Sequence, residues 1–327
     1  MKILVTIPIW DDAAKTIEAS APDAEFIYIR EKKVAQEDVK DIDIILGNIP
    51  QGLLKYAEKL RFYQLYTAGS NKLIEEKCVP ENVKLCCASG AYGVAIAEHM
   101  LASLFTLIKN LQVYEQNKKE HIWKSAGRVK GIAGSVTLVI GAGNIGSEFG
   151  RRMNALGSTV IGIRRHSSRP EEFMSECGTM EDIDKYLPLA DYVSCTLPET
   201  PQTIGLFDRR KFELMKNDAV FINAGRGSVV SSILLAEILN EGVIGGACLD
   251  VTDTEPLPDD NPLWDAENLV LTPHISGWFH MRQTYDSVVD ILSRNLKAFL
   301  TGGELISEVD RESGYRKFKA GISLNRT

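Results

Sequence analysis

Three polar residues stand at or just after the ends of apolar segments, and their side chains suit one reaction. Arg226 ends the run AVFINAGR, Glu255 follows the run GGACLDV, and His274 ends the run NLVLTPH. Taken singly, they are equally well explained as a surface cap, a loop charge and a half-buried imidazole. Together they supply a cation that binds a carboxylate, an acid that protonates a carbonyl oxygen, and a carboxylate that holds that acid in position. The set predicts reduction of a 2-oxo acid, or the reverse oxidation of a 2-hydroxy acid.

The run GAGNIG, residues 141–146, predicts a dinucleotide site because an apolar segment precedes it and a helix-like segment follows it. Gly141 allows a tight turn, Gly143 lets backbone amides approach a pyrophosphate, and Gly146 lets the helix pack closely on the strand. Asn144 and Ile145 lie at the start of the helix, where its partial positive charge faces the phosphates. The alternative is a glycine-rich turn without a ligand.

The second strand of the same series ends without an acidic residue. In NAD-binding sheets an Asp or Glu at this place binds the ribose 2′-hydroxyl. Here the strand runs into Arg164, Arg165, His166, Ser167 and Ser168. Guanidinium and hydroxyl groups suit a 2′-phosphate, so we expect NADP to be preferred over NAD. The alternative is a solvated basic loop.

The segments around these motifs predict two parallel sheets. Short runs rich in β-branched residues alternate with helix-like segments, and parallel strands need such crossovers. The expected strands of the first series are 2–8, 24–30, 41–48, 60–67 and 83–89, and those of the second are 136–141, 159–164, 191–197, 219–225, 245–251 and 268–274. The fold class is therefore α/β, with two Rossmann-like or flavodoxin-like doubly wound domains and a cleft between them.

Helical patterns link and close these series. Residues 94–111 form one long, mostly apolar segment that we expect to be buried. Residues 231–242 and 282–300 show apolar positions at helical spacing. We expect a substrate-binding domain of residues 1–92 plus 280–327 and an NAD(P)-binding domain of residues 93–279. The final segment has no strands for a sheet of its own, so it should return to the first domain.

Composition excludes some classes of function. The chain has 327 residues and a net charge of −7, which argues against a nucleic-acid surface. Its six cysteines form no C-x-x-C pair, and no metal site is expected. Free thiols, no signal peptide and no apolar run long enough to span a membrane indicate the cytoplasm.

Several motifs together resemble the D-2-hydroxyacid dehydrogenase family over nearly the whole chain. They are VIGAGNIG, LPETPQT, FINAGRGSVV, GGACLDVTDTEPLP, LVLTPHISG and VDRESGY. The resemblance implies that Arg226, Glu255 and His274 are the catalytic residues. It also implies that Ala68 and Gly69, in YTAGSNKL, offer backbone amides to the substrate carboxylate. Further cofactor contacts are implied at Leu197, Pro198, Thr203, Asn223, Ala224, Gly225, Asp250, His274 and Gly277, with Asp250 beside the nicotinamide amide.

The family further implies a homodimer, with an arm at about residues 110–132 that carries Trp123 at the interface. Trp278 and Phe279 stand where the family often has smaller residues, and we expect them to narrow the substrate pocket toward glyoxylate- or hydroxypyruvate-like acids. Glu98 and His99 lie in the apolar helix and are interpreted as structural. Without a further domain after Tyr315, a serine-responsive phosphoglycerate dehydrogenase is not expected.

Two other functions fit the same motifs. One is a formate- or phosphite-type dehydrogenase of the same superfamily, which also uses an arginine and a histidine near the hydride. The other is a non-catalytic protein that senses NAD(P), since such relatives can keep these residues. Activity with glyoxylate or hydroxypyruvate, as against formate or phosphite, separates the enzymes, and tight binding without turnover would indicate the sensor.

Overall fold

A computed structural model describes residues 1–10, 12–70, 73–74, 76–165, 169–312 and 314–317. The contacts divide the chain into two compact units, Met1–Tyr92 with Phe279–Thr327, and Gly93–Trp278. Each unit contains one parallel sheet. The α/β class with two doubly wound parallel sheets, expected from the alternating segments, is confirmed.

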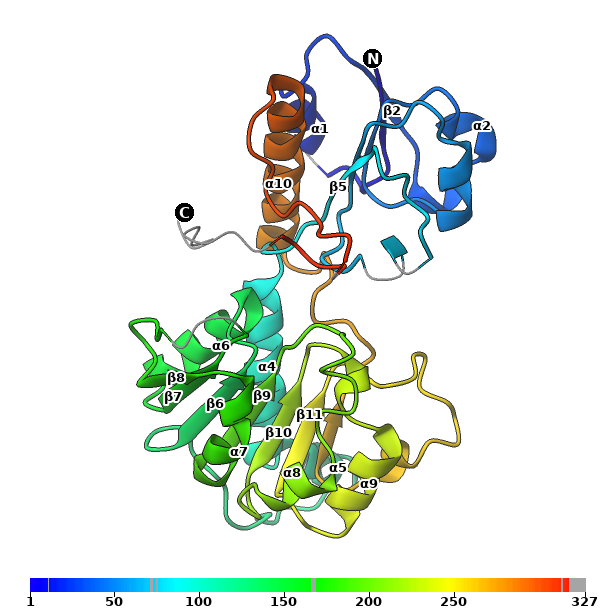
Figure 1. The fold of residues 1–327 in the computed structure, drawn as a ribbon. Helices are drawn as coiled ribbons and strands as arrows, with labels where there is room; N and C mark the ends of the chain where they lie inside the picture. The colour runs from blue at the N-terminus through cyan, green and yellow to red at the C-terminus, as the bar shows by residue number, and fades with distance from the viewer. Residues whose placement is uncertain (11, 71–72, 75, 166–168, 313, 318–327) are drawn as a thin grey trace. The chain divides into compact units, whose positions relative to one another are not determined.

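The first unit is built on five parallel strands (Figure 1). Their order in the sheet is β2-β1-β3-β4-β5, the flavodoxin-like arrangement. The strands are β1 (Lys2–Val5), β2 (Glu25–Tyr28), β3 (Ile44–Leu46), β4 (Phe62–Gln64) and β5 (Lys84–Cys86). The helices and 3-10 turns are α1 (Ala13–Glu18), η1 (Glu31–Lys33), α2 (Gln36–Val39), η2 (Gln51–Tyr56) and α10 (Arg282–Thr301).

The end of the chain returns to this unit. Helix α10 packs against α1 and β4 (Figure 1). Beyond it, Glu308 forms an antiparallel bridge with Cys86 of β5, and the N–H of Val309 donates to the carbonyl of Leu85 at 2.9 Å. Residues Glu308 and Val309 therefore add to the β5 edge of the first sheet.

Phe279 belongs to the first unit, although we expected it in the second. Its ring lies 5.4 Å from that of Tyr66, 5.7 Å from that of Tyr285 and 6.1 Å from that of Trp10. Only 6% of Phe279 is exposed. The ring is an anchor in this aromatic cluster, and the expectation that it narrows a substrate pocket stays a prediction.

The second unit holds seven parallel strands, in the order β12-β11-β10-β9-β6-β7-β8. They are β6 (Val136–Ile140), β7 (Thr159–Ile163), β8 (Glu176–Gly178), β9 (Tyr192–Cys195), β10 (Val220–Asn223), β11 (Gly246–Leu249) and β12 (Leu269–Leu271). We expected six, and β8 is the strand that was missed. It is a three-residue edge strand with the sequence ECG, which carries no apolar run.

Helices cover both faces of this sheet. They are α4 (Gly93–Ile108), α5 (Leu111–Lys119), α6 (Asn144–Ala155), α7 (Ile183–Tyr186), α8 (Arg209–Glu213) and α9 (Ser232–Asn240), with the 3-10 turns η3 (Met180–Asp182), η4 (Leu187–Leu189), η5 (Gly227–Val229) and η6 (Pro262–Asp265). Helix α4 packs against α6, β11 and β12. The single helix expected over 94–111 is wrong at its end: Asn110 has a φ of 57°, and this left-handed residue separates α4 from α5.

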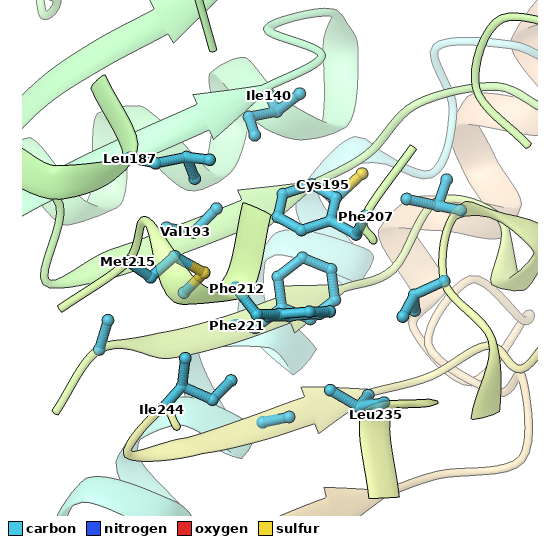
Figure 2. Packing of buried hydrophobic residues seen from close by; sticks show 14 of the residues in the cluster. Ile140, Leu187, Val193, Cys195, Phe207, Phe212, Met215, Phe221, Leu235 and Ile244 are labelled. Carbon is cyan, nitrogen blue, oxygen red and sulfur yellow. The ribbon is translucent and has the colours of Figure 1, made fainter. Parts of the chain in front are cut away.

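One hydrophobic core of the second unit contains buried residues of β6, β9, β10 and β11 together with residues of α7, α8 and α9 (Figure 2). Phe207, Phe212 and Phe221 meet there, with ring centroids 4.6 to 5.4 Å apart. Burying one such side chain stabilises the fold by about 1.5–3 kcal/mol. This core fixes β9, β10 and β11, and therefore the loops that follow them.

All six cysteines are thiols rather than halves of disulfides, and four of them are buried. Desolvation raises the pKa of the Cys195 thiol to about 12 and that of Cys87 to about 11. These thiols stay protonated and packed, as buried, unreactive cysteines do.

Among the described residues, no single helix is long and apolar enough to cross a membrane. The pair α4 and α5 meets the criterion of length and composition only when joined, and it bends by 64°.

Candidate active site

The imidazole of His274 and the carboxylate of Glu255 form a hydrogen-bonded pair. Nδ1 of His274 lies 2.7 Å from Oε2 of Glu255. The other carboxylate oxygen of Glu255 accepts from the backbone N–H of Thr252 at 3.1 Å. This second bond fixes the carboxylate, so the imidazole is oriented through Nδ1 and its Nε2 is left for another partner.

The backbone of His274 adopts a conformation that is uncommon for a residue with a side chain. Its φ is 51°, in the left-handed region. Its N–H donates to the carbonyl of Asp250 at 2.7 Å and to that of Thr272 at 3.1 Å. Such a conformation persists only where the surroundings hold it, and it is often found at functional sites. The turn after β12 is therefore built to aim this side chain.

The carboxylate of Asp250 stabilises the turn that carries His274 by accepting hydrogen bonds from it. Asp250 is only 4% exposed, and its carboxylate oxygens take four protein donors. Oδ1 accepts from the Thr272 hydroxyl at 2.7 Å and from the Ile275 N–H at 3.0 Å, while Oδ2 accepts from the N–H of Ser276 at 3.0 Å and from its hydroxyl. A carboxylate offers about four acceptor positions, so these donors use them all. The contact expected between Asp250 and a nicotinamide amide stays a prediction.

His99 supports the same turn. Its Nε2 lies 2.9 Å from the Thr272 hydroxyl, which donates to Asp250. Because that hydroxyl has one proton, Nε2 of His99 must carry the hydrogen that completes the chain. This matches the structural interpretation of His99. Glu98, however, is exposed rather than buried, and it pairs with Arg152 at 3.4 Å.

Arg226 follows β10 and enters η5. The side chain of Asn223 shapes this turn: its amide donates to the carbonyl of Arg226 at 3.0 Å, and its oxygen accepts from the N–H of Gly225 at 3.1 Å. The Arg226 guanidinium donates to the carbonyl of Gly225 at 2.8 Å and is partly exposed. Strands β10, β11 and β12 are neighbours, so Arg226, Glu255 and His274 follow three adjacent strands at the same edge of the sheet.

Gly227 is a site residue that the motif search did not single out. A Cβ there would lie 1.9 Å from the carbonyl carbon of Thr252, so only glycine fits. The turn that carries Arg226 thus rests directly on the loop that carries Glu255. The run G-R-G around Arg226 was the available signal.

The glycine turn has the shape that a pyrophosphate needs. Gly141 has a φ of 90°, and a Cβ on Gly146 would lie 2.4 Å from the carbonyl oxygen of Gly141. A Cβ on Gly143 would have no neighbour closer than 3.9 Å, so the space above this residue is open. Helix α6 begins here with no side-chain cap, which leaves backbone N–H groups of Asn144 and Ile145 for an anion. The residues present fit a dinucleotide.

The other predicted cofactor residues of this unit gather at the same sheet edge. The hydroxyl of Thr196, after β9, donates to the carbonyl of Gly141 at 2.8 Å, and a Cβ on Gly225 would lie 2.7 Å from the carbonyl of Leu197. Thr203 folds back, and its hydroxyl donates to the carbonyl of Pro198 at 2.7 Å. Ala224 is buried beside Gly225, whereas Gly277 and the exposed Trp278 lie in the turn after His274.

The residues expected at the ribose differ from one another in their surroundings. Nε of Arg164 donates to the carbonyl of Ala142 at 3.0 Å, and its guanidinium is paired with Glu171. Arg165 is exposed. Ser167, with His166 and Ser168, lies outside the described residues. The pairing of Arg164 was not foreseen.

The predicted substrate loop lies in the first unit, after β4. The Thr67 hydroxyl donates to the carbonyl of Gly69 at 3.2 Å, and the Ser70 hydroxyl donates to that of Gly314 at 2.7 Å. These bonds shape the backbone of Ala68 and Gly69 from both sides. The role of that loop stays a prediction.

Known proteins with similar sequences and structures agree on one family. A crystal structure of a D-isomer specific 2-hydroxyacid dehydrogenase family protein from Aeromonas salmonicida matches 95% of this chain and 99% of its own, with 28% identity and a TM-score of 0.83. The NADPH-dependent glyoxylate/hydroxypyruvate reductase from Sinorhizobium meliloti, solved with NADP and sulfate, matches 96% and 99%, with 25% identity and a TM-score of 0.81.

A curated glyoxylate reductase from Korarchaeum cryptofilum is 29% identical over 281 residues, which are 83% of each chain. The family model for the NAD binding domain of D-isomer specific 2-hydroxyacid dehydrogenases matches residues 101–276, more than half of the chain. The chain is therefore a member of the D-isomer specific 2-hydroxyacid dehydrogenase family, a family of NAD(P)-dependent oxidoreductases.

Proposed function

We propose that this chain reduces a small 2-oxo acid, of the size of glyoxylate or hydroxypyruvate, to a D-2-hydroxy acid with NAD(P)H, and catalyses the reverse oxidation. The pair formed by His274 and Glu255 carries the proposal. It stands at the same sheet edge as a glycine turn shaped for a dinucleotide. An acid with a fixed tautomer beside a hydride donor is what carbonyl reduction requires.

The chain's residues divide the reaction as follows. Arg226 binds the substrate carboxylate through its guanidinium fork. Nδ1–H of His274 is donated to Glu255, so Nε2–H faces the carbonyl oxygen and gives it a proton. A nicotinamide cofactor held at the glycine turn would supply the hydride for the carbonyl carbon. After the step the imidazole is neutral and the product carries a hydroxyl, and in the oxidative direction the same Nε2 accepts that proton.

We also propose a preference for NADPH. The turn after β7 holds Arg164 and Arg165 and lacks the acidic residue that would bind a ribose 2′-hydroxyl. The similar enzyme from Sinorhizobium meliloti is described as NADPH-dependent. A comparison of kcat/KM for NADPH and NADH, at one substrate concentration and ionic strength, tests this preference. A clear preference for NADH would contradict it.

A homodimer is proposed on the arm that follows α4. Helix α5 and the segment after it expose Leu111, Val113, Tyr114, Ile122, Trp123 and Val129, and Trp123 is fully exposed. Monomeric proteins rarely expose so many apolar side chains in one segment. Sedimentation of the protein and of a Trp123→Ser variant tests this. If the unsubstituted protein sediments as a monomer at micromolar concentration, that result contradicts the proposed homodimer.

The test of the activity is a panel of rates for glyoxylate, hydroxypyruvate, pyruvate and phenylpyruvate with both cofactors. Oxidation of formate and of phosphite is measured beside it. Turnover of the small oxo acids supports the proposal. Turnover of formate or phosphite alone would indicate the other dehydrogenase class. Tight NADPH binding without turnover of any of these acids would indicate a nucleotide sensor.

A further inference from the structure

The carboxylate of Glu171 lies against the place where the cofactor ribose is expected. Arg164 is the first residue after β7, and its Nε is fixed to the carbonyl of Ala142, the second residue of the glycine turn. In sheets of this type the adenosine ribose lies between that turn and the end of the second strand. The same guanidinium is paired with Glu171. Glu171 therefore supplies an acidic group at this place, from a loop seven residues along the chain.

Two more donors converge on this carboxylate. The hydroxyl of Ser147, a residue only 3% exposed in the first turns of α6, donates to Oε1 of Glu171 at 3.0 Å. The guanidinium of Arg151 donates to Oε2 at 2.9 Å. Two guanidinium groups and a hydroxyl are the donors that a phosphate monoester would take. Glu171 is thus held by groups that also suit a 2′-phosphate.

The guanidinium group of Arg151 beside Glu171 also has another carboxylate partner. Arg151 is shared with Glu148 at 2.7 Å, and Glu148 also pairs with Arg152 at 2.6 Å. The guanidinium groups of Arg164 and Arg151 therefore already have carboxylate partners before any nucleotide binds. A 2′-phosphate that binds Arg164 is repelled by the negative charge of Glu171 at close range. A neutral 2′-hydroxyl is not repelled, and the oxygens of Glu171 already accept from Arg164, Arg151 and Ser147.

We infer that Glu171 is a specificity residue that competes with the 2′-phosphate of NADPH for Arg164 and Arg151. The inference rests on the proposed cofactor site. On this account Arg164 favours NADPH, and Glu171 limits how strongly it does so. Neutralising Glu171 releases both guanidinium groups for the phosphate and leaves a nucleotide with a free 2′-hydroxyl nearly unaffected.

The test is the binding of two nucleotides that differ only by the 2′-phosphate. Calorimetric titration gives the Kd of adenosine 2′,5′-bisphosphate and of 5′-AMP for the whole chain and for Glu171→Gln. The matched control is Glu172→Gln, because Glu172 is exposed, adjacent in sequence and carries the same charge. Since a hydrogen bond to a charged group contributes roughly 1.5–3 kcal/mol, the bisphosphate should bind about tenfold more tightly to Glu171→Gln. The affinity of Glu171→Gln for 5′-AMP should differ less than about threefold from that of the unsubstituted chain.

Arg164→Ala supplies a second comparison. In the Arg164→Ala background, Glu171→Gln should lose much of its effect on the bisphosphate, because the released partner is gone. The variant Glu171→Asp keeps the negative charge but places it farther from the two guanidinium groups, because its side chain is one methylene shorter. The bisphosphate should therefore bind more tightly to Glu171→Asp than to the unsubstituted chain, by a smaller factor than to Glu171→Gln. Glu171→Asp keeps the test available if the glutamine variant unfolds.

Three results would overturn the inference. They are an unchanged bisphosphate affinity in Glu171→Gln, an equal gain in Glu172→Gln, and a loss of affinity for both nucleotides in Glu171→Gln alone. Failure of the unsubstituted chain to bind either nucleotide would remove the cofactor site itself, and the inference with it. That result is distinct from the others, since in them the unsubstituted chain still binds.

Discussion

Nδ1 of His274 lies 2.7 Å from Oε2 of Glu255, while the backbone of His274 is held at a φ of 51° by the carbonyl of Asp250. The two contacts act on different parts of one residue. The carboxylate fixes the tautomer and ring orientation, and the backbone bond fixes where the side chain starts. A proton donor aimed in this way loses little freedom when a substrate binds.

Replacing Glu255 by Gln should lower kcat/KM for oxo-acid reduction about ten- to a hundredfold. The carboxylate of Glu255 accepts from Nδ1 of His274 and orients the imidazole so that Nε2 can act as the acid. A glutamine amide is a neutral acceptor, and a hydrogen bond to a charged group contributes roughly 1.5–3 kcal/mol. Steady-state kinetics of the reduction measure this.

The matched control for that experiment is Asp259→Asn. Asp259 is an exposed carboxylate four residues further along the same loop, so the variant has the same change in net charge. Its kcat/KM should coincide with that of the unsubstituted protein. A Glu255→Gln variant whose kcat/KM also coincides would remove Glu255 from the proton-transfer step.

Arg226→Lys should lower kcat/KM for the oxo acid about ten- to a hundredfold. A lysine keeps the charge but cannot form two parallel bonds to a carboxylate, and one bond to a charged group contributes roughly 1.5–3 kcal/mol. The affinity for NADPH, measured by fluorescence titration, should stay within about threefold. Arg209→Lys, at an exposed ion pair with Glu241, serves as the control. Near-normal efficiency in Arg226→Lys would assign the carboxylate to another cation.

Trp278→Ala should widen the range of substrates. Trp278 is about half exposed in the turn that follows His274, and its bulk motivates the proposal of a small oxo acid. Removing the indole should raise the ratio of kcat/KM for phenylpyruvate to kcat/KM for glyoxylate. The expected increase is about tenfold, which is the effect of one methylene group in a hydrophobic pocket. Phenylpyruvate as the best substrate of the unsubstituted protein would contradict this prediction. Phe279→Ala is expected to lower stability instead, because the ring is buried in the cluster with Tyr66 and Tyr285.

The strands other than β8 could be predicted because each contains a short apolar run, whereas β8 has the sequence ECG. Their ends could not, since apolar residues continue into the turns at the carboxyl edge. The run VTLVIG, for example, ends as a strand at Ile140, because Gly141 has left-handed backbone geometry. The break at Asn110 was missed for a related reason: a single left-handed residue changes no pattern of hydrophobicity.

The site residues that directly follow a strand could be predicted from the sequence. The contacts made by residues of longer loops could not. His274 and Glu255 were paired from residue type alone, and the structure places them in contact. The partner of Arg164 could not be found in this way. Glu171 reaches it through a loop whose path sequence spacing does not define, so an arginine that looked available is already paired.

Asp250→Asn tests whether the turn around His274 depends on this buried carboxylate. Asparagine has one carbonyl oxygen and one NH2 group where aspartate has two oxygens. Its NH2 group must therefore face protein donors that a carboxylate oxygen now accepts from. The hydroxyls of Thr272 and Ser276 can rotate, but the N–H groups of Ile275 and Ser276 cannot. Either orientation of the amide therefore leaves the N–H of Ile275 or of Ser276 without its present acceptor.

The expected cost of that loss is about 1–3 kcal/mol in the free energy of unfolding. If part of it is taken up by displacement of the turn, kcat for oxo-acid reduction should fall more than the KM changes, because the acid is misplaced while the carboxylate anchor at Arg226 remains. Denaturant unfolding and steady-state kinetics measure the two effects, with Asp259→Asn again as the control of equal charge. An asparagine variant that keeps both the unfolding free energy and kcat would show that the four hydrogen bonds to Asp250 do not hold His274 in place.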